Sequence, residues 1–299
     1  MEPKKLPYLN IAAYVFYPLV DTQSFKSKLK EKLNSLESLL GTILISHEGV
    51  NFYFAGFDED ISELKRILHT ELGVPECDYK ESYSEENPYR KLLFKIRKEI
   101  ISTGISEIKP SEFTGKYISP EELKSWYDDN KDFVILDTRN DYEIKVGKFK
   151  NAQEFKIRHF REFFEKTKEA PENWKEKDVV TYCTGGIRCE KATAFMLQEA
   201  GFKNVFQLKG GILKYFEKFG GEHYEGDCFV FDHRVSVKSN LDEAETIMCF
   251  ACRTPLLKHE LESEDYIPDI SCPYCVDKIK RDKISTIQGV QRQQEAKNT

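Results

Sequence analysis

One short loop in the sequence combines the residue types that make a cysteine reactive. It runs from Cys183 to Arg188 and reads Cys-Thr-Gly-Gly-Ile-Arg. The two glycines allow backbone N–H groups to turn toward one point, and Arg188 adds a full positive charge. Both features favour the thiolate, which is the reactive form of cysteine. We therefore predict that Cys183 and Arg188 are catalytic residues.

The rest of this loop shapes the site, and one neighbouring thiol has two interpretations. The active-site loop between the two catalytic residues consists of Thr184, Gly185, Gly186 and Ile187. Cys189 follows Arg188 directly, and it either has a resolving or assisting role or only packs. For Cys183 itself, the alternative is a buried structural thiol, because free cysteines are often buried.

The elements around the loop form an α/β pattern. A buried strand over 178–183 precedes the loop and a helix over 190–200 follows it, so the helix start adds partial positive charge near the sulfur. In open α/β sheets, sites lie at the carboxyl ends of strands. Strands over 133–137 and 205–211 and helices starting at 120 and 212 continue the alternation. This alternation predicts a parallel sheet.

The N-terminal third has a different pattern. We predict strands over 8–17, 42–46, 51–56 and 91–101 and helices over 22–38 and 59–72. The order β-α-β-β-α-β is that of a ferredoxin-like fold. The sequence thus predicts a ferredoxin-like domain over 1–101, a linker over 102–117, an α/β domain over 118–220 and a small cysteine-rich C-terminal region over 221–299 with a frayed tail.

Four cysteines in the C-terminal region have the spacing of a metal site. They form two Cys-x-x-Cys pairs separated by nineteen residues: Cys249, Cys252, Cys272 and Cys275. This matches the separation of about 15–20 residues in structural Cys₄ zinc sites. Four thiolates leave no open position on the metal, so the zinc ion would stabilise the fold. The alternative is unmetallated thiols or redox disulfides.

Composition restricts the partners and the location. The chain has 299 residues and a net charge of −6, which excludes a polycation that binds nucleic acid non-specifically. It lacks an apolar run of about 18 residues and a signal-peptide pattern at the N-terminus. We therefore expect a cytoplasmic protein without a membrane partner, and nothing in the sequence indicates an obligate protein partner.

One basic segment is a candidate RNA-binding surface. Residues 88–98 contain Arg90, Lys91, Lys95 and Arg97 without any acidic residue. On a strand such residues can contact phosphates, and Tyr89 is available for base stacking. The alternative is an edge strand that lysines protect from aggregation.

Three sequence blocks resemble rhodanese-type sulfurtransferases: VILDTRNDYE (134–143), DVVTYCTGGIRCEKA (178–192) and LKGGILKYF (208–216). The rhodanese active-site loop spans six residues from cysteine to arginine, as here, whereas related dual-specificity phosphatases use seven. The resemblance thus favours sulfur over phosphate chemistry, and it identifies 118–220 as a rhodanese domain. It implies that Cys183 carries a persulfide and that Asp137 and Arg139 support the adjacent end of the sheet.

The whole chain is similar to the tRNA uridine(34) hydroxylase family of rhodanese-domain proteins. The similarity includes GTILISHEGVNFYFAG (41–56), YCTGGIRCEKA (182–192) and the C-terminal Cys-x-x-Cys pairs. It implies oxygen-dependent formation of 5-hydroxyuridine at the wobble position, with tRNA as partner and molecular oxygen as co-substrate. Two other functions stay open: a sulfurtransferase that relays persulfide sulfur through Cys183, and a non-enzymatic RNA-binding or scaffold protein.

The sequence has no signature of a flavin, haem or nucleotide cofactor. It lacks a Gly-rich dinucleotide fingerprint in the right context and the His-x-Asp/Glu spacing of a non-haem iron site. One hypothesis is that Cys183 adds to the electrophilic carbon of uracil, as in nucleophilic catalysis by cysteine. The neighbouring carbon would then be electron-rich enough to react with oxygen.

Overall fold

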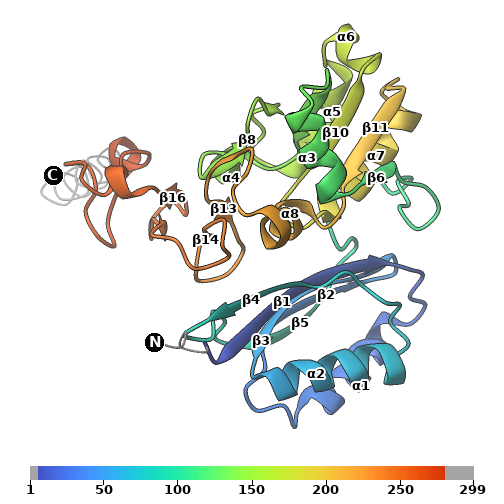
Figure 1. The fold of residues 1–299 in the computed structure, drawn as a ribbon. Helices are drawn as coiled ribbons and strands as arrows, with labels where there is room; N and C mark the ends of the chain where they lie inside the picture. The colour runs from blue at the N-terminus through green and yellow to red at the C-terminus, as the bar shows by residue number, and fades with distance from the viewer. Residues whose placement is uncertain (1–5, 280–299) are drawn as a thin grey trace, which may run out of the picture. The chain divides into compact units, whose positions relative to one another are not determined.

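The computed structural model describes residues 6–279. The chain divides into two compact units, residues 1–244 and 245–299. The first unit contains two five-stranded sheets and two short strand pairs, and most of these strands are labelled in Figure 1. The predicted domain bounds at 101, 117 and 220 fall within this first unit and remain a prediction.

The N-terminal sheet has five strands with two helices on one face (Figure 1). In chain order the elements are β1 (Tyr8–Phe16), α1 (Thr22–Leu33), β2 (Leu40–Ser46), β3 (Gly49–Gly56), α2 (Asp58–Arg66), a π-helix (Ile67–Glu71), β4 (Lys80–Ser84) and β5 (Leu92–Ile96). The strand order is β4-β1-β3-β2-β5. The strands pair antiparallel except β5, which runs parallel to β2.

The βαββαβ pattern is confirmed, but the sequence analysis assigned the wrong segment to its fourth strand. That strand is Lys80–Ser84, at one edge beside β1. The strand predicted over 91–101 is a shorter fifth strand at the opposite edge, Leu92–Ile96. The sequence Lys-Glu-Ser-Tyr-Ser lacks the apolar alternation that marks a half-buried strand, so pattern analysis missed it.

Alternation along β1 gives the N-terminal sheet two different faces. Leu9, Ile11 and Ala13 belong to the core beneath the helices, where Leu29 of α1 and Leu64 of α2 are fully buried. The intervening residues point to the opposite face, because side chains alternate along a strand; these are Asn10, Ala12 and Tyr14. That opposite face, called the open face below, is therefore free to contribute to a site.

The second sheet is parallel throughout, as predicted, in the order β6-β11-β10-β7-β9. Ser119 caps the helix that begins at Pro120, as predicted, since Ser119 Oγ accepts from the Glu122 N–H at 3.1 Å. The elements are β6 (Lys116–Ile118), α3 (Pro120–Asp128), β7 (Val134–Asp137), α4 (Asp141–Ile144), β8 (Gly147–Phe149), β9 (Gln153–Glu154), a 3₁₀ turn (Phe160–Glu162), α5 (Phe163–Lys168), α6 (Glu172–Lys175), β10 (Asp178–Tyr182), α7 (Ile187–Gln198), β11 (Asn204–Leu208) and α8 (Gly211–Phe219).

Short strand pairs complete both units. In the first unit, β12 (Tyr224–Gly226) pairs with β8, and β13 (Cys228–Phe229) pairs with β14 (Ser236–Val237). In the second unit, β15 (Ile247–Met248) pairs with β16 (Pro255–Leu256), and a 3₁₀ turn (Lys258–Glu260) follows. The residues between β12 and 244, including β13 and β14, thus belong to the first unit.

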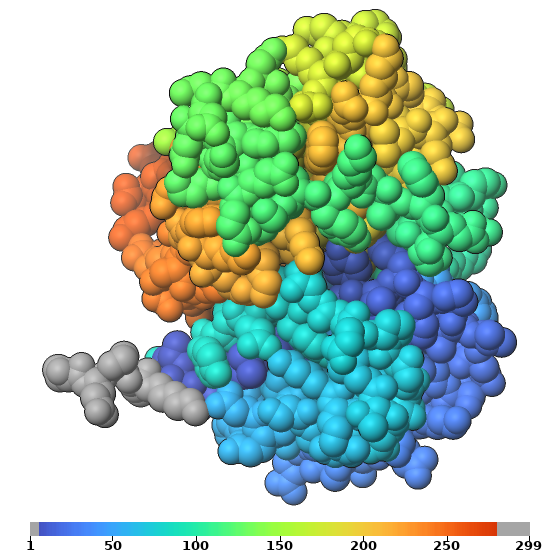
Figure 2. Space-filling model, turned by 45° about the vertical axis from the view of Figure 1, so that its right-hand side comes forward, coloured from blue at the N-terminus to red at the C-terminus, as the bar shows by residue number. Residues whose placement is uncertain are grey.

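Buried polar contacts join the two sheets of the first unit, whose parts pack directly against each other in Figure 2. Lys191 of α7 is buried, and its Nζ lies 2.8 Å from carboxylate oxygens of both Glu48 and Glu99. The neighbouring Glu190 accepts a 2.9 Å hydrogen bond from the Tyr14 hydroxyl. These contacts hold the open face of the N-terminal sheet beside the loop that follows β10.

Candidate active site

The cysteine loop lies at the carboxyl end of β10, between β11 and β7 in the sheet. Cys183 follows β10 directly, and α7 begins at Ile187. Gly186 caps this helix with φ +99°, a conformation that glycine adopts without strain. Gly211 at the start of α8 must also be glycine, because a Cβ there would lie 2.4 Å from the carbonyl oxygen of Cys183.

The loop surrounds the sulfur with hydrogen-bond donors. Cys183 is 1% exposed, and the Gly186 N–H donates to its Sγ at 3.1 Å. Burial acts to raise the pKa of the Cys183 thiol, but the Cys189 thiol, the Arg188 charge and the amides of Arg188 and Gly186 together lower it to about 5. A thiolate is the expected form at neutral pH.

Cys189 lies close enough to affect that thiolate. It is fully buried on the first turn of α7, with its Sγ 3.7 Å from Thr138 Oγ1. Burial and the hydrogen bond with Cys183 raise the pKa of the Cys189 thiol well above its ordinary value. Cys189 therefore keeps its proton, and its S–H donates a hydrogen bond to the Cys183 thiolate. This arrangement supports the assisting role and leaves that role a prediction.

Arg188 has a buried partner that was not predicted from the sequence. Its guanidinium donates two hydrogen bonds, of 2.6 and 2.7 Å, to the Glu143 carboxylate, and both side chains are buried. Charge-assisted bidentate pairs of this kind fix orientation. A signal was present, because Asn140 and Glu143 have the residue types and spacing of a capping box at the start of α4, but the sequence does not show the link to a residue 45 positions away.

Asp137 and Arg139 form a second buried pair, at the end of the neighbouring strand. Arg139 donates to both carboxylate oxygens of Asp137 at 2.7–3.2 Å and to the carbonyl of Gly147 at 2.7 Å. Asp137 aligns with Tyr182 in the sheet, one residue before Cys183. The pair is thus located where the rhodanese resemblance implied, and its supporting role stays a prediction.

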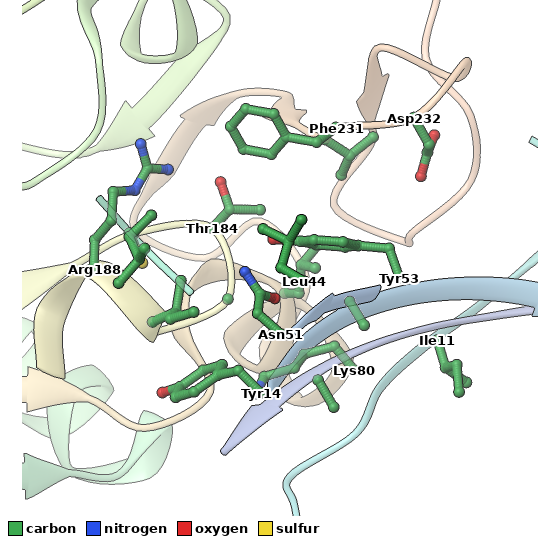
Figure 3. Close-up of a pocket in the computed structure, with 18 of the residues that line it drawn as sticks. Ile11, Tyr14, Leu44, Asn51, Tyr53, Lys80, Thr184, Arg188, Phe231 and Asp232 are labelled. Atoms are coloured by element: carbon green, nitrogen blue, oxygen red, sulfur yellow. The ribbon is translucent and has the colours of Figure 1, made fainter. Parts of the chain in front are cut away.

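A cavity of about 460 Å³ opens in front of the loop. Part of its wall is the active-site loop, including Cys183 and Arg188, with Thr184, Gly185 and Ile187 between them. The segment after β13 contributes a half-exposed aromatic ring, Phe231. Figure 3 shows the labelled side chains of the cavity wall. The cavity could not be predicted from the sequence, because its walls come from many segments that lie far apart in the chain.

Another part of the wall is the open face of the N-terminal sheet. Tyr14 aligns with Asn51, and Ala12 aligns with Tyr53 on one side and Lys80 on the other. All five residues line the cavity. Because Ala12 is small, the longer side chains beside it border a hollow. The two-residue period of β1 was visible in the sequence, but nothing in the sequence indicated what this face contacts.

The predicted RNA-binding residues are separated by the structure. Arg90 precedes β5, and the other three lie on or beside this edge strand. Lys91 and Arg97 are exposed and Lys95 is half-buried. Among the four, Arg97 lines the cavity, as does the predicted stacking residue Tyr89. An edge strand fits both the RNA-binding interpretation and its alternative, so RNA binding by these residues stays a prediction.

The second unit brings the four cysteines of the predicted metal site together. The sulfur atoms of Cys249, Cys252, Cys272 and Cys275 all lie within 4.8 Å of one another. Individual separations are 3.6, 3.7 and 4.0 Å. A tetrahedral zinc ion with Zn–S bonds of about 2.3 Å requires separations of about 3.8 Å. The cluster therefore fits a metal such as zinc in a closed, structural site.

We expect the purified full-length protein to contain one zinc ion per chain, measured by inductively coupled plasma mass spectrometry. Replacing Cys272 by serine removes a thiolate ligand, so zinc is expected to be lost and the melting temperature to fall. The control is Cys77→Ser, since Cys77 lies outside the cluster. If the wild-type protein is metal-free, with four thiols that react readily, the zinc interpretation is wrong.

Comparisons with known proteins agree with this architecture. Residues 8–100 match the model of the UPF0176 acylphosphatase-like domain, and residues 119–218 match the rhodanese-like domain. A protein from Cupriavidus metallidurans named tRNA uridine(34) hydroxylase is 42% identical over 90% of this chain and 96% of its own length. A protein of the same name from Ralstonia nicotianae has the same identity and coverage. The predicted fold class, with its N-terminal α+β and central rhodanese domains, is confirmed.

Proposed function

The chain belongs to the tRNA uridine(34) hydroxylase family, and we propose that it converts the wobble uridine of tRNA to 5-hydroxyuridine. Oxygen is the proposed co-substrate: one of its atoms enters the base at C5 and the other leaves as water. This balance consumes two electrons and two protons, so a two-electron reductant takes part. Cys183 is the proposed nucleophile.

The observation that supports this function best is a stabilised thiolate in the wall of a cavity suited to a nucleobase. A volume of about 460 Å³ is typical of small-ligand pockets, which range from about 300 to 1,000 Å³. Enzymes that act on a base take it out of its stack and into such a pocket. Bases of an anticodon loop are unpaired, so moving one of them out of its stack costs less free energy than in a duplex.

The reaction begins with addition of the thiolate to the ring. The Cys183 sulfur attacks C6 of uracil, and the electron pair of the C5–C6 double bond moves toward C5 and O4. C5 thereby becomes electron-rich and able to react with oxygen. Loop amides stabilise the thiolate before attack, and the Glu143–Arg188 pair fixes the loop geometry.

Binding of tRNA is proposed to use both charge and stacking at the cavity. Arg97 lies on the cavity wall, where a guanidinium can contact a phosphate. Phe231 is half-exposed, and the centre of its ring lies 5.9 Å from Cζ of Arg188. Its ring offers a surface on which a base can stack. Arg90, Lys91 and Lys95 would extend the phosphate contacts along β5.

The cytoplasm, where tRNA is modified, is the proposed location. In the part of the chain that the structure describes, no helix combines the length and apolar character needed to cross a membrane. A zinc ion held by the four cysteines would stabilise residues 245–279 and take no part in the reaction.

The proposal is tested by nucleoside mass spectrometry. The full-length protein is incubated with an unmodified tRNA transcript containing uridine 34 and a thiol reductant, in air and without oxygen. We expect 5-hydroxyuridine to form in air and not without oxygen. In a second experiment, tRNA from cells that lack the protein should have lost 5-hydroxyuridine. If those cells instead lose thiolated nucleosides, the chain is a persulfide-relaying sulfurtransferase and the hydroxylase proposal is wrong.

A further inference from the structure

A buried lysine lies on the cavity wall opposite the loop elements already described. Lys80 begins β4, is 4% exposed and lines the cavity. It aligns with Ala12, so its side chain lies on the open face of the sheet, where the small alanine leaves space beside it. In Figure 3 the chain of Lys80 runs along this face toward Tyr14, and Nζ lies 5.0 Å from the centre of the Tyr14 ring.

The charge of Lys80 is only partly neutralised by its neighbours. Nζ donates a 2.8 Å hydrogen bond to the backbone carbonyl of Asp78, while the Asp78 carboxylate is 3.7 Å away and equally close to Lys214. Burying a cation is costly unless negative charge compensates it. Burial lowers the pKa of Lys80, whereas Asp78 and the Cys183 thiolate act to raise it. The thiolate thus contributes to keeping the lysine charged.

The arginines of the cavity wall are engaged elsewhere or exposed. Arg188 and Arg234 each form a bidentate pair with a carboxylate. Arg97 is exposed to solvent. Lys80 differs from these arginines. It is buried, and its one direct hydrogen bond goes to a neutral carbonyl and not to a carboxylate. Its remaining N–H groups can serve a ligand in the cavity.

Addition of a thiolate to uracil requires such a group. As the bond from sulfur to C6 forms, the electron pair of the C5–C6 bond shifts toward C4 and the C4–O4 π pair moves onto O4. The product is an enolate with its negative charge mainly on that oxygen. A fixed donor aimed at the developing charge stabilises the transition state more than the ground state.

We propose that Lys80 is a catalytic residue that donates a hydrogen bond to uracil O4 while the Cys183 sulfur adds to C6. This inference rests on the proposed function and names the group that activates its substrate. The step is a reversible addition: it forms one S–C bond, converts one C–C π bond to an enolate and needs no oxidant. Oxygen enters only afterwards, at C5.

Hydrogen exchange tests this step separately from hydroxylation. Without oxygen, the enolate takes a deuteron at C5 from deuterated water; loss of the original C5 hydrogen and of the thiolate then restores uracil with deuterium at C5. The full-length protein is incubated anaerobically with a uridine-34 transcript in deuterated water, and exchange is followed by nucleoside mass spectrometry. We expect exchange with wild type, none with Cys183→Ala, and exchange slower by about 10²-fold with Lys80→Met.

Matched variants exclude indirect effects. Lys214→Met removes the other lysine near the Asp78 carboxylate but lies outside the cavity wall, so it should exchange like wild type. Lys80→Arg keeps the cation and should recover part of the rate. All variants are compared at a temperature below their melting transitions, and tRNA affinity is measured in parallel.

Several outcomes overturn the inference. The inference is wrong if Lys80→Met exchanges hydrogen at the wild-type rate. It is also wrong if this variant binds tRNA more weakly while its exchange rate is unchanged, which would indicate a phosphate contact. If wild type hydroxylates in air but does not exchange without oxygen, the addition step and the role of Lys80 are both wrong. If wild type does neither, the proposed function itself fails, whatever the Lys80 variants show.

Discussion

Replacing Cys183 by alanine is expected to lower hydroxylation of uridine 34 by about 10⁴-fold or more, as is found when a catalytic nucleophile is removed. In the proposed reaction the sulfur is the atom that bonds to C6, and alanine offers no replacement. The measurement is the initial rate of 5-hydroxyuridine formation in a tRNA transcript. Affinity for tRNA should change little, because the buried thiolate is not the main contact with phosphates.

The matched control for this substitution is Cys77→Ala. Cys77 is partly exposed, lies outside the cavity wall, and has a pKa that burial raises to about 11, so it is an unreactive thiol. The Cys77 variant should keep the wild-type rate. A Cys183→Ala protein that hydroxylates normally would show that the nucleophile has been assigned to the wrong residue.

Breaking the Arg188–Glu143 pair is expected to destabilise the fold and to shift the reactive thiol in a predictable direction. In Arg188→Met, the buried Glu143 loses its partner, and such a loss typically costs about 3–5 kcal/mol of unfolding free energy. The pKa of Cys183 should rise, because one of the charges that lower it is gone. Denaturant unfolding and the ultraviolet absorbance of the thiolate measure the two effects.

The reciprocal variant tests the sign of the electrostatic effect. Glu143→Gln also weakens the buried pair, but it leaves an uncompensated guanidinium near the sulfur, so the pKa of Cys183 should fall. The control is Arg158→Met, which removes an exposed arginine 3.5 Å from Asp141 and should change unfolding by less than about 1 kcal/mol. Shifts of the Cys183 pKa in the same direction in both buried variants would contradict this electrostatic account.

Local patterns in the sequence were enough to identify the cysteine whose pKa its surroundings lower. The strand, the loop and the helix that follow one another around Cys183 are contiguous, and the groups that lower its pKa, in Gly186, Arg188 and Cys189, all belong to that segment. The spacing of the two Cys-x-x-Cys pairs likewise predicted that their four sulfur atoms lie together. Chemistry that depends on neighbours in the chain can therefore be recognised from the order of the residues alone.

The other parts of the site depend on contacts between distant segments. Glu143 reaches Arg188 only because β7 and β10 are neighbours in the sheet. Lys80 enters the cavity from a strand that carries no apolar alternation, and the register with Ala12 determines which way it points. Such partners cannot be identified from spacing, because the sequence separation reflects the length of the connections between strands.

The depressed pKa of Cys183 also makes stability depend on pH. Its folded value of about 5 lies below the ordinary 9.0, so the unfolded chain binds more protons between these two limits. The unfolding free energy of wild type relative to Cys183→Ala should therefore increase as pH rises from about 5 to about 9. That contribution is complete above pH 9 and disappears below pH 5. Urea unfolding across this range checks the sign.

The most direct test of the whole account is a titration of Cys183 in the intact protein. The thiolate absorbance of wild type minus that of Cys183→Ala is recorded as a function of pH, so that the other thiols cancel. We predict a midpoint near 5, as expected when amides, a thiol donor and a guanidinium surround the sulfur. A midpoint near 9.0, the ordinary value for cysteine, would contradict the claim that this loop holds a thiolate ready to attack uracil.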